Sequence, residues 1–384
     1  MATIANLLGA TAVLLAAGGA AGAADWSTAP TMSVGASYVS NPRLLADRKP
    51  HDEALSAEFS LPILRKSELT ECSLTPLVRD TRFRSDHSLN HDEQSLLANI
   101  SHRGELATWT ADAGVQRDTT LTSELGVTGL TQATLRHQRL SASLGADRQL
   151  APLLSLGAQL SWEGDSYQYR PSSGLTDYHF SAVSLQASYL ASAATRWTLT
   201  ALADRLDLPG NANFSNDIAL RLGFQYATGP AWSFTLNGGP SRVQTRIEQR
   251  SGWVAALQAD RRAERATLSL LASRGVKPSG RGTLTTTDDV TVKVGWAVTE
   301  RLQSALQLHA IRSRDVVPAI GYQYLDIKYG VVDASLSWRW TETLTLNARV
   351  GGNGQRDSFA PGTRSGAFGS LNLSWSGDWG SAAR

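Results

Sequence analysis

The feature that most constrains this chain is a strict alternation of apolar and polar residues, which recurs in segment after segment. Between residues 343 and 350, for example, Leu344 and Ala348 belong to the apolar set, whereas Thr345 and Asn347 belong to the polar set. A period of two residues places the two sets on opposite faces of an extended chain. The alternation therefore predicts β-strands that each have one apolar face and one polar face.

We count about eighteen such segments, near residues 31–40, 53–63, 67–79, 95–103, 105–115, 134–147, 153–163, 178–191, 196–206, 216–227, 231–240, 251–261, 265–274, 286–298, 301–312, 328–340, 343–351 and 365–376. Most approach the roughly 9–11 residues that a tilted strand needs to cross the hydrocarbon layer, and they exceed the roughly 5–6 residues typical of soluble strands. Sixteen strands also fit, because the early segments are the least regular, and we expect an even number.

The connections between these segments alternate in length. Short links are expected at residues 65–66, 104, 192–195, 229–230, 262–265, 299–300 and 341–342. Long polar links are expected at residues 40–52, 80–94, 116–133, 164–177, 275–285, 313–327 and 352–364. Outer-membrane barrels combine tight periplasmic turns with long outer loops. A soluble sandwich or propeller, the alternative all-β architecture, explains neither this asymmetry nor the strand lengths.

In lipid every backbone N–H and C=O group must be paired, so a sheet can span a membrane only as a closed barrel. The sequence therefore predicts an all-β fold, a transmembrane antiparallel up-and-down β-barrel of 16–18 strands. No segment after the N-terminal region has about 18 consecutive apolar residues, which excludes a helical multispan protein.

Composition agrees with this fold. Charged residues are 18 % of the chain, whereas ordinary soluble domains have about 25 %. Hydrophobic residues are 42 % and the mean hydropathy is −0.20. The net charge of +2 is too balanced to indicate a nucleic-acid partner. The single cysteine, Cys72, excludes an intrachain disulfide framework and is best explained as a packing residue.

The N-terminus has the pattern of a secretory signal. The apolar run Leu7 to Ala17 is followed by Ala21-Gly22-Ala23, an A-x-A cleavage pattern. No Lys or Arg precedes the apolar run, which departs from the usual signal. We expect residues 1–23 to be a cleaved signal peptide and residues 24–384 to form one outer-membrane β-barrel.

Aromatic residues follow the expected strand directions. Six tryptophans fall at strand ends on the periplasmic side and are expected to form an interface girdle: Trp197, Trp232, Trp296, Trp338, Trp340 and Trp375. Six tyrosines fall near the opposite rim: Tyr38, Tyr167, Tyr169, Tyr178, Tyr322 and Tyr324. Indole and phenol rings favour a membrane interface because they are apolar and also form hydrogen bonds.

The polar faces of the predicted strands would surround the barrel interior. The charged candidates for the lumen wall are Arg139, Asp147, Glu163, Arg221, Asp260, Lys293, Asp333, Arg339 and Arg349. Because their signs are mixed, the sequence does not indicate a strong anion or cation filter. A solvated lumen wall is the plain interpretation of each residue, and an arginine row facing acidic groups would create a transverse field for polar solutes.

Sequence motifs for catalysis are missing. No GxSxG, HExxH, P-loop or CxxC pattern occurs, so we predict no catalytic residue, no metal site and no cofactor. Adjacent His/acid pairs occur at His51-Asp52, Asp86-His87 and His91-Asp92. Such pairs could serve a hydrolase or bind a divalent ion, but neighbours on an extended chain point to opposite sides, so polar loop residues are the preferred interpretation.

The sequence resembles a known bacterial family. The residues that carry the resemblance are the segment from Arg117 to Gly129, Arg136 and Arg139, the segment from Gly174 to Tyr178, and the segment from Ala36 to Pro42. Together they resemble the outer-membrane β-barrel family associated with exopolysaccharide and exosortase gene clusters, which is porin-like and poorly characterised. The resemblance implies an envelope location, names polysaccharide passage as a candidate role and supplies no catalytic residues. We also expect Arg117, Asp118 and Glu124 either to fold their loop inward by ion pairs or to be solvated.

We therefore expect a passive porin-like channel, or passage of exopolysaccharide, and no enzymatic activity. The alternative is a structural or adhesive barrel with a plugged lumen, whose outer loops bind surface glycan. A third hypothesis is a hydrolase that uses the His/acid pairs. Expected partners are outer-membrane lipid and lipopolysaccharide, the barrel-assembly machinery, and polysaccharide or small polar solutes.

The last aromatic residues, Trp375 and Trp379, precede a Gly-Ser-Ala-Ala-Arg end, which departs from the usual aromatic end of such barrels. The oligomeric state stays open.

Overall fold

The computed structural model describes residues 25–45, 51–127, 135–168, 174–210, 214–229, 231–246, 248–317, 325–358 and 362–377. The predicted signal peptide, residues 1–23, lies outside these residues. The strands are β1 Asp25–Thr28, β2 Thr31–Ser40, β3 His51–Ser60, β4 Ile63–Lys66, β5 Thr70–Phe83, β6 His91–Arg103, β7 Ala107–Thr119, β8 Arg136–Ala151, β9 Leu154–Tyr167, β10 Tyr178–Ser192, β11 Thr195–Asp207, β12 Phe214–Thr228, β13 Trp232–Thr245, β14 Gln249–Arg262, β15 Ala266–Ser279, β16 Thr283–Ala297, β17 Leu302–Asp315, β18 Asp326–Arg339, β19 Leu344–Asp357 and β20 Arg364–Ser376. Two short helices, η1 (His87–Leu89) and α2 (Thr120–Val127), belong to the connections.

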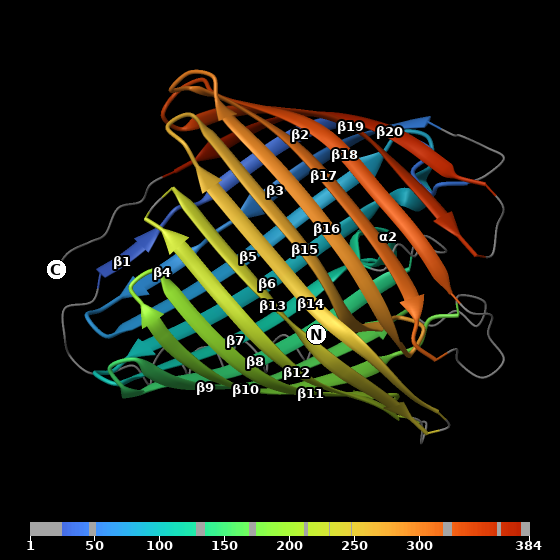
Figure 1. Ribbon diagram of the computed structural model, residues 1–384. Helices are drawn as coiled ribbons and strands as arrows, with labels where there is room; N and C mark the ends of the chain where they lie inside the picture. The colour runs from blue at the N-terminus through green and yellow to red at the C-terminus, as the bar shows by residue number, and fades with distance from the viewer. Residues whose placement is uncertain are drawn as a thin grey trace.

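The strands form one closed antiparallel barrel (Figure 1). From β5 to β20 each strand pairs with the next along the chain. The barrel closes where β2 pairs with β20, from Thr31 opposite Ser376 to Val39 opposite Phe368. β1 continues β2, and β4 continues β3 in the same register, so the twenty segments make eighteen wall strands. The predicted fold and the upper predicted strand number are thus confirmed.

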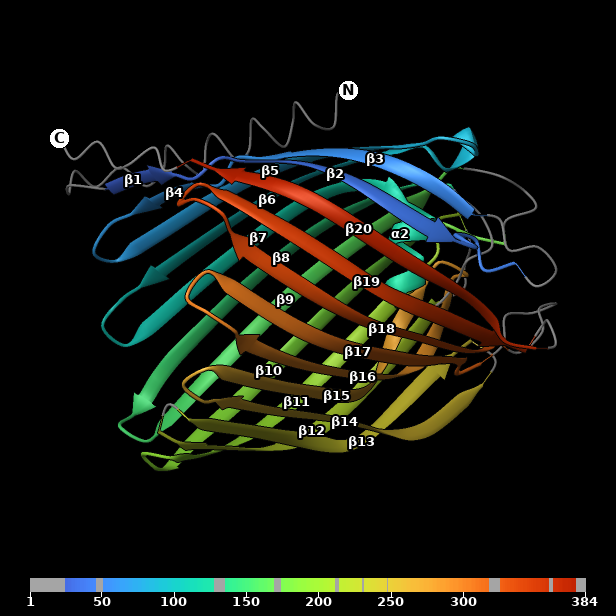
Figure 2. The ribbon, with the colours of Figure 1, turned by 90° about the horizontal axis from the view of Figure 1, so that it is seen from above.

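The two ends of the barrel differ, as Figure 2 shows. At one end the turns are short, for example Pro152 and Leu153 between β8 and β9. At the other end, which we call the outer end, some connections are much longer, and the one between β7 and β8 contains α2. This asymmetry is the one expected of outer-membrane barrels.

One predicted long link is wrong. Residues 275–285 were expected to be a loop, but β15 continues to Ser279 and β16 starts at Thr283, which leaves a turn of residues 280–282. The link predicted at residues 80–94 is also shorter, because β5 runs to Phe83 and β6 begins at His91. The outer parts of these strands lie beyond the apolar band. Their residues therefore do not alternate between apolar and polar, and the sequence predicts a loop there.

Contacts between distant strands identify the inward face of the wall. Tyr167 of β9, Leu206 of β11 and Val243 of β13 belong to one buried cluster. Because strands that are not neighbours can meet only across the interior, this face of β9, β11 and β13 points inward. By alternation along the same strands, the exposed side chains of Leu160, Leu199 and Leu236 point outward.

Two of the predicted rim tyrosines, at the outer ends of β9 and β10, face the interior. Tyr167 and Tyr178 are buried, with 8 % and 2 % of their surfaces exposed, inside the cluster just described. They belong to the inward face because the outer strand ends and connections fold over the interior. Tyr169, Tyr322 and Tyr324 lie outside the described residues, whereas Tyr38 is 46 % exposed.

The outward face carries an apolar band. Large apolar side chains with 45–62 % of their surface exposed include Val34, Leu144, Leu185, Leu220, Leu306 and Val350. An exposed apolar surface that surrounds the wall is compatible with lipid, and a soluble monomer rarely exposes an apolar patch of this extent. The chain is therefore a transmembrane barrel of the bacterial outer membrane. Among the described residues no helix is both long enough and apolar enough to cross a membrane.

A substitution of Gly239 tests the close packing between β12 and β13 in the wall. A Cβ atom at this position would lie 1.9 Å from the backbone oxygen of Leu220, so Gly239→Ala must push β12 and β13 apart. We expect a loss of about 1–3 kcal/mol in stability, measured as a lower temperature at which the compact, fast-migrating gel band of the unboiled protein disappears. Gly275→Ala is the matched control, since nothing lies within 4 Å of its Cβ position. Equal behaviour of the two variants would contradict this packing.

Candidate channel interior

The connection after β7 turns inward and forms α2. In Figures 1 and 2 α2 lies within the outline of the barrel, near its outer end. Thr122 and Ser123 donate hydroxyl hydrogen bonds to the carbonyl oxygen of Thr119, at 2.8 and 3.1 Å. The Thr120 backbone N–H donates to Leu135 (3.0 Å), while the Thr120 hydroxyl accepts from the Leu135 N–H (3.1 Å). The first turn of the helix is thus fixed to the start of β8.

The same helix also contacts β3, β5 and η1 at the outer end. Leu121 packs on a small buried cluster made of Ala54, Phe83 and Leu89. This cluster joins β3, β5 and η1, so α2 connects two separate parts of the wall.

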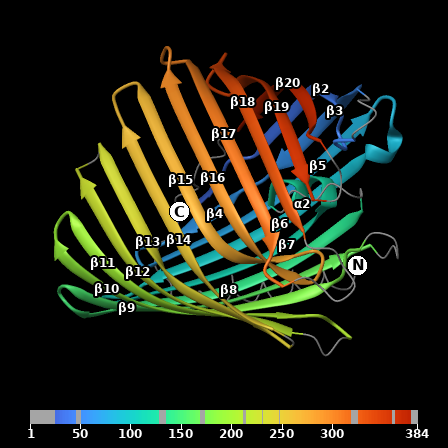
Figure 3. The same cartoon turned by 45° about the vertical axis from the view of Figure 1, so that its right-hand side comes forward.

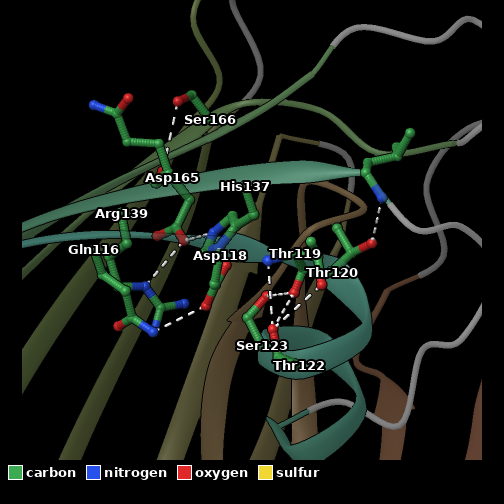
Figure 4. Close-up of polar contacts among 12 residues, drawn as sticks. Gln116, Asp118, Thr119, Thr120, Thr122, Ser123, His137, Arg139, Asp165 and Ser166 are labelled. Atoms are coloured by element: carbon green, nitrogen blue, oxygen red, sulfur yellow. Dashed lines mark hydrogen bonds and ion pairs between the residues drawn. The ribbon is translucent and has the colours of Figure 1, made fainter. Parts of the chain in front are cut away.

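A buried ionic network lies beside the start of α2 (Figure 4). His137 of β8 lies between two carboxylates: its Nδ1 is 2.7 Å from Asp118 and its Nε2 is 2.5 Å from Asp165. All three residues are at most 4 % exposed. Because ionised carboxylates only accept hydrogen bonds, both ring nitrogens donate and the ring is a positively charged imidazolium. The network connects β7, β8 and β9 next to the start of α2.

Arg139 extends this network along β8. Its Nε is 3.0 Å from Asp165, and its guanidinium is 3.7 Å from Glu163, one of the predicted wall residues. The Tyr178 hydroxyl donates to Glu163 at 3.4 Å. Two predicted candidates, Arg139 and Glu163, therefore face each other on adjacent strands.

The charged residues Arg117, Asp118 and Glu124 do not behave alike. Asp118 does hold its connection inward, through His137. Arg117 instead reaches Gln138, with Nε 3.4 Å from the amide oxygen, and is exposed. The side chain of Glu124 lies outside the described residues. His137 was not among the sequence candidates, although it lies two residues before Arg139 and so shares its face.

A second ion pair joins two further candidates. Arg349 of β19 binds Asp333 of β18 through two hydrogen bonds of 2.8 and 2.9 Å. The guanidinium also lies over the Phe368 ring, 5.2 Å from its centre. Asp333 is 5 % exposed, so the pair is partly shielded from water.

The other predicted wall residues are dispersed. Asp260 accepts from Gln258 at 2.8 Å and from Ser269 at 2.7 Å. In the part of the chain that the structure describes, Asp147, Lys293 and Arg339 have no ion-pair partner. Arg221 shares its face of β12 with Asp217, which lies opposite Asp204 of β11. These two aspartates are 1 % and 8 % exposed, and neither was a site candidate.

A buried apolar cluster, which we call the mouth cluster, crosses the outer end. It comprises Tyr167, Tyr178, Leu206, Val243, Leu284, Val316 and Val317, with Leu175, Phe180, Leu208 and Val276 packed against it. The Thr176 N–H donates to the Gly280 oxygen at 2.8 Å, which joins the β9–β10 connection to the turn between β15 and β16. Gly282 has a φ of 72°, which favours glycine, and a Cβ there would meet Thr176 and Leu208. Inward-folded segments therefore cover part of the outer end.

Four predicted girdle tryptophans lie on strand ends beside short turns, Trp340 lies in the turn after β18, and Trp375 lies near the end of the last strand, β20. Five are 42–55 % exposed, and Trp375 is half-buried. Trp338 and Trp340 stack with ring centres 6.2 Å apart, and the Arg261 guanidinium is 5.1 Å from the Trp232 ring centre.

The His/acid pairs serve the local backbone. Asp52 accepts from the N–H groups of Glu53, Ser85 and Asp86, at 2.7–3.0 Å. Asp86 accepts from the Ser88 N–H at the start of η1, and the Ser88 hydroxyl also donates to it, which lowers the pKa of the Asp86 carboxyl. Across the described ranges no three His, Cys, Asp or Glu side chains are grouped so that they could hold a metal ion.

No protein-family model matches the sequence, and no curated protein matches it either. Solved structures do match. OccK2 (OpdF) of Pseudomonas aeruginosa is 13 % identical, with 93 % of this chain and 98 % of that chain covered and a TM-score of 0.50. The same protein in complex with glucuronate is also 13 % identical, with 92 % and 98 % covered and a TM-score of 0.50. The outer membrane protein OpdK of the same bacterium is 14 % identical, with 91 % and 99 % covered and a TM-score of 0.46. At this identity the likeness concerns the fold alone: the chain has the β-barrel architecture of OccK2 (OpdF).

Proposed function

We propose that this protein is a passive, porin-like channel for small polar solutes, without turnover chemistry. The observation that carries the proposal is the contrast between the two faces of the wall: the outward face is apolar, whereas the inward face holds paired charges. A barrel of eighteen strands is wide enough for an aqueous lumen.

The nine charged candidates are the proposed lining of this pathway. In two places they form opposite-charge pairs, Arg139 with Glu163 and Arg349 with Asp333. Each pair presents a positive and a negative group side by side, and such a surface orients dipolar solutes such as sugars or zwitterions. The mixed signs support weak selectivity between anions and cations.

The mouth cluster supports a restricted entrance. Because segments from β9–β10, β15–β16 and β17–β18 meet across the outer end, a solute must pass beside them. We propose that these inward-folded segments limit the size of the solute. Exopolysaccharide passage is a narrower version of the proposal, supported only by the family resemblance. We also propose outer-membrane lipid, lipopolysaccharide and the barrel-assembly machinery as partners.

Single-channel recording tests this function directly. In planar bilayers the purified barrel should give discrete conductance steps, and its permeability for small anions and cations should differ by no more than a few-fold. A barrel that inserts, keeps its heat-sensitive gel mobility and does not conduct would contradict the channel. That result would favour the structural barrel with a plugged lumen, which binding of surface glycan would then test.

Weakening the mouth cluster should widen the entrance. Leu175 packs against the cluster and also against Leu325 and Ile327. We expect Leu175→Ser to raise the mean conductance or the open fraction measurably in the same recordings, because a polar side chain disfavours burial there. Leu308→Ser, on the outward face, is the control and should leave conductance unchanged. No change in the Leu175 variant would show that these segments do not restrict the pathway.

The paired charges should control selectivity in opposite directions. Arg349→Gln leaves the negative charge of Asp333 and should shift the reversal potential in a salt gradient toward cation preference. Asp333→Asn should shift it toward anion preference, and the double variant should return close to the original value. Arg205→Gln is the control, since this residue pairs with Asp207 on the outward face. Shifts of the same sign in both single variants would place this pair outside the conducting pathway.

A further inference from the structure

One boundary between neighbouring wall strands is only partly paired. β14 and β15 pair from Ala255 opposite Arg274 down to Arg262 opposite Thr267. Toward the outer end, residues 249–254 of β14 pair with β13 alone, and residues 275–279 of β15 pair with β16 alone. Figures 1 and 3 show the tips of the β13–β14 and β15–β16 hairpins apart from each other. We call this unpaired boundary the seam.

The seam contains a cavity of about 180 Å³. Val243 on the inward face of β13 lines it, and so does Trp253 on the outward face of β14. Residues from the two faces of an intact sheet cannot line one cavity, so the cavity reaches through the wall at this point.

The seam begins where the apolar band ends. Below it, Leu257 of β14 and Leu270 of β15 belong to the outward apolar face. Trp253 is 56 % exposed at the upper edge of that face. Tryptophan at such an edge marks the level of the lipid headgroups. The seam therefore opens at the height where outer-leaflet lipids carry their phosphates.

Arginine side chains gather at this height. The Arg274 guanidinium lies 4.3 Å from the centre of the Trp253 ring. Arg274 and Arg314 share a single carboxylate, Asp288, at 3.5 and 3.1 Å. The Arg314 Nε atom is buried and forms no hydrogen bond with the described residues. A buried guanidinium N–H without an acceptor is costly, and an anion would supply that acceptor.

The remaining charges near the cavity are already neutralised. Arg250, which also lines it, pairs with Glu248 at 2.6 Å. Asp315 lies 3.6 Å from Arg281 and also accepts from Thr283 and the Leu325 N–H. Two guanidinium groups against one carboxylate thus leave one net positive charge in the seam.

We propose that the seam binds the phosphate of a membrane lipid, namely a phosphorylated glycolipid of the outer leaflet, through Arg274 and Arg314. Guanidinium groups match phosphate oxygens with two parallel hydrogen bonds, and the Trp253 ring faces the adjoining acyl region. Basic pockets between membrane-spanning segments bind lipid headgroups by the same chemistry. The two arginines lie on the outward face and are not among the proposed lumen-lining charges, so the proposal does not depend on conduction.

The test is native mass spectrometry of the purified barrel in zwitterionic detergent, with diphosphorylated lipid A as the probe. We expect the original protein to retain the lipid and the Arg274→Gln/Arg314→Gln double variant to retain it about tenfold less, given the strength of charge-assisted hydrogen bonds. Asp288→Asn, which removes the competing carboxylate, should increase retention several-fold. Arg205→Gln, an outward arginine on β11, should behave like the original protein.

Three outcomes would overturn the proposal. Dephosphorylated lipid A retained equally well would show that phosphate is not recognised. Displacement of the lipid by millimolar inorganic phosphate would show that the seam binds the free anion instead. Equal loss in the Arg205 variant would assign retention to the whole basic rim. If the double variant lacks the heat-sensitive gel mobility, the Asp288→Asn result alone decides, because its predicted sign is opposite to that of damage.

Discussion

Backbone hydrogen bonding across the pairing of β2 with β20 is the interaction on which the rest of this molecule depends. Without it the sheet would have two open edges in the membrane, and each unpaired N–H or C=O group in hydrocarbon would cost several kcal/mol. Closure turns an extended sheet into a wall with an inside and an outside. Only then do the alternating residues acquire separate roles, with apolar side chains toward lipid and polar side chains toward the interior.

The closed wall also explains where charge can be placed. Inside the barrel, several charges are held in pairs such as Arg349 with Asp333, or in the chain of Asp118, His137 and Asp165. Outside, the charged residues occur beyond the apolar band, as Arg205 and Asp207 do on β11. The barrel therefore has two electrostatic environments, which a single layer of strands separates except where the cavity of the seam reaches through the wall. A solute in the interior and a lipid on the outside experience different groups.

The sequence alone was enough to predict the membrane-crossing part of the fold, because the lipid imposes a period of two on every strand there. It could not predict the outer strand ends: four of the five residues 283–287 of β16 are threonines, and nothing in Thr283, Thr285 or Thr287 distinguishes them from a loop. The inward-facing charged residues of the candidate site were predictable only in part. Alternation placed Arg139 and Glu163 on one face, but the partners of His137 come from β7 and β9, and their meeting depends on the strand register. The burial of Tyr167 and Tyr178 likewise follows from inward-folded connections that no local pattern encodes.

The opposite end of the barrel has its own irregularity, at the boundary where β1 and β4 continue β2 and β3. Pro30 and Pro62 separate the two pairs of segments, and Pro76 lies nearby on β5. Proline has no backbone N–H group, so three adjacent wall strands each lack a donor close to the closing pair. Among the described residues, the backbone hydrogen bonds at this level run from the Ala29 N–H to Pro62 (3.4 Å), from the Leu61 N–H to Pro76 (3.1 Å) and from the Gly377 N–H to Pro30 (2.9 Å). The periplasmic rim beside the closing pair therefore has fewer backbone donors than the fully paired strands on the far side of the barrel.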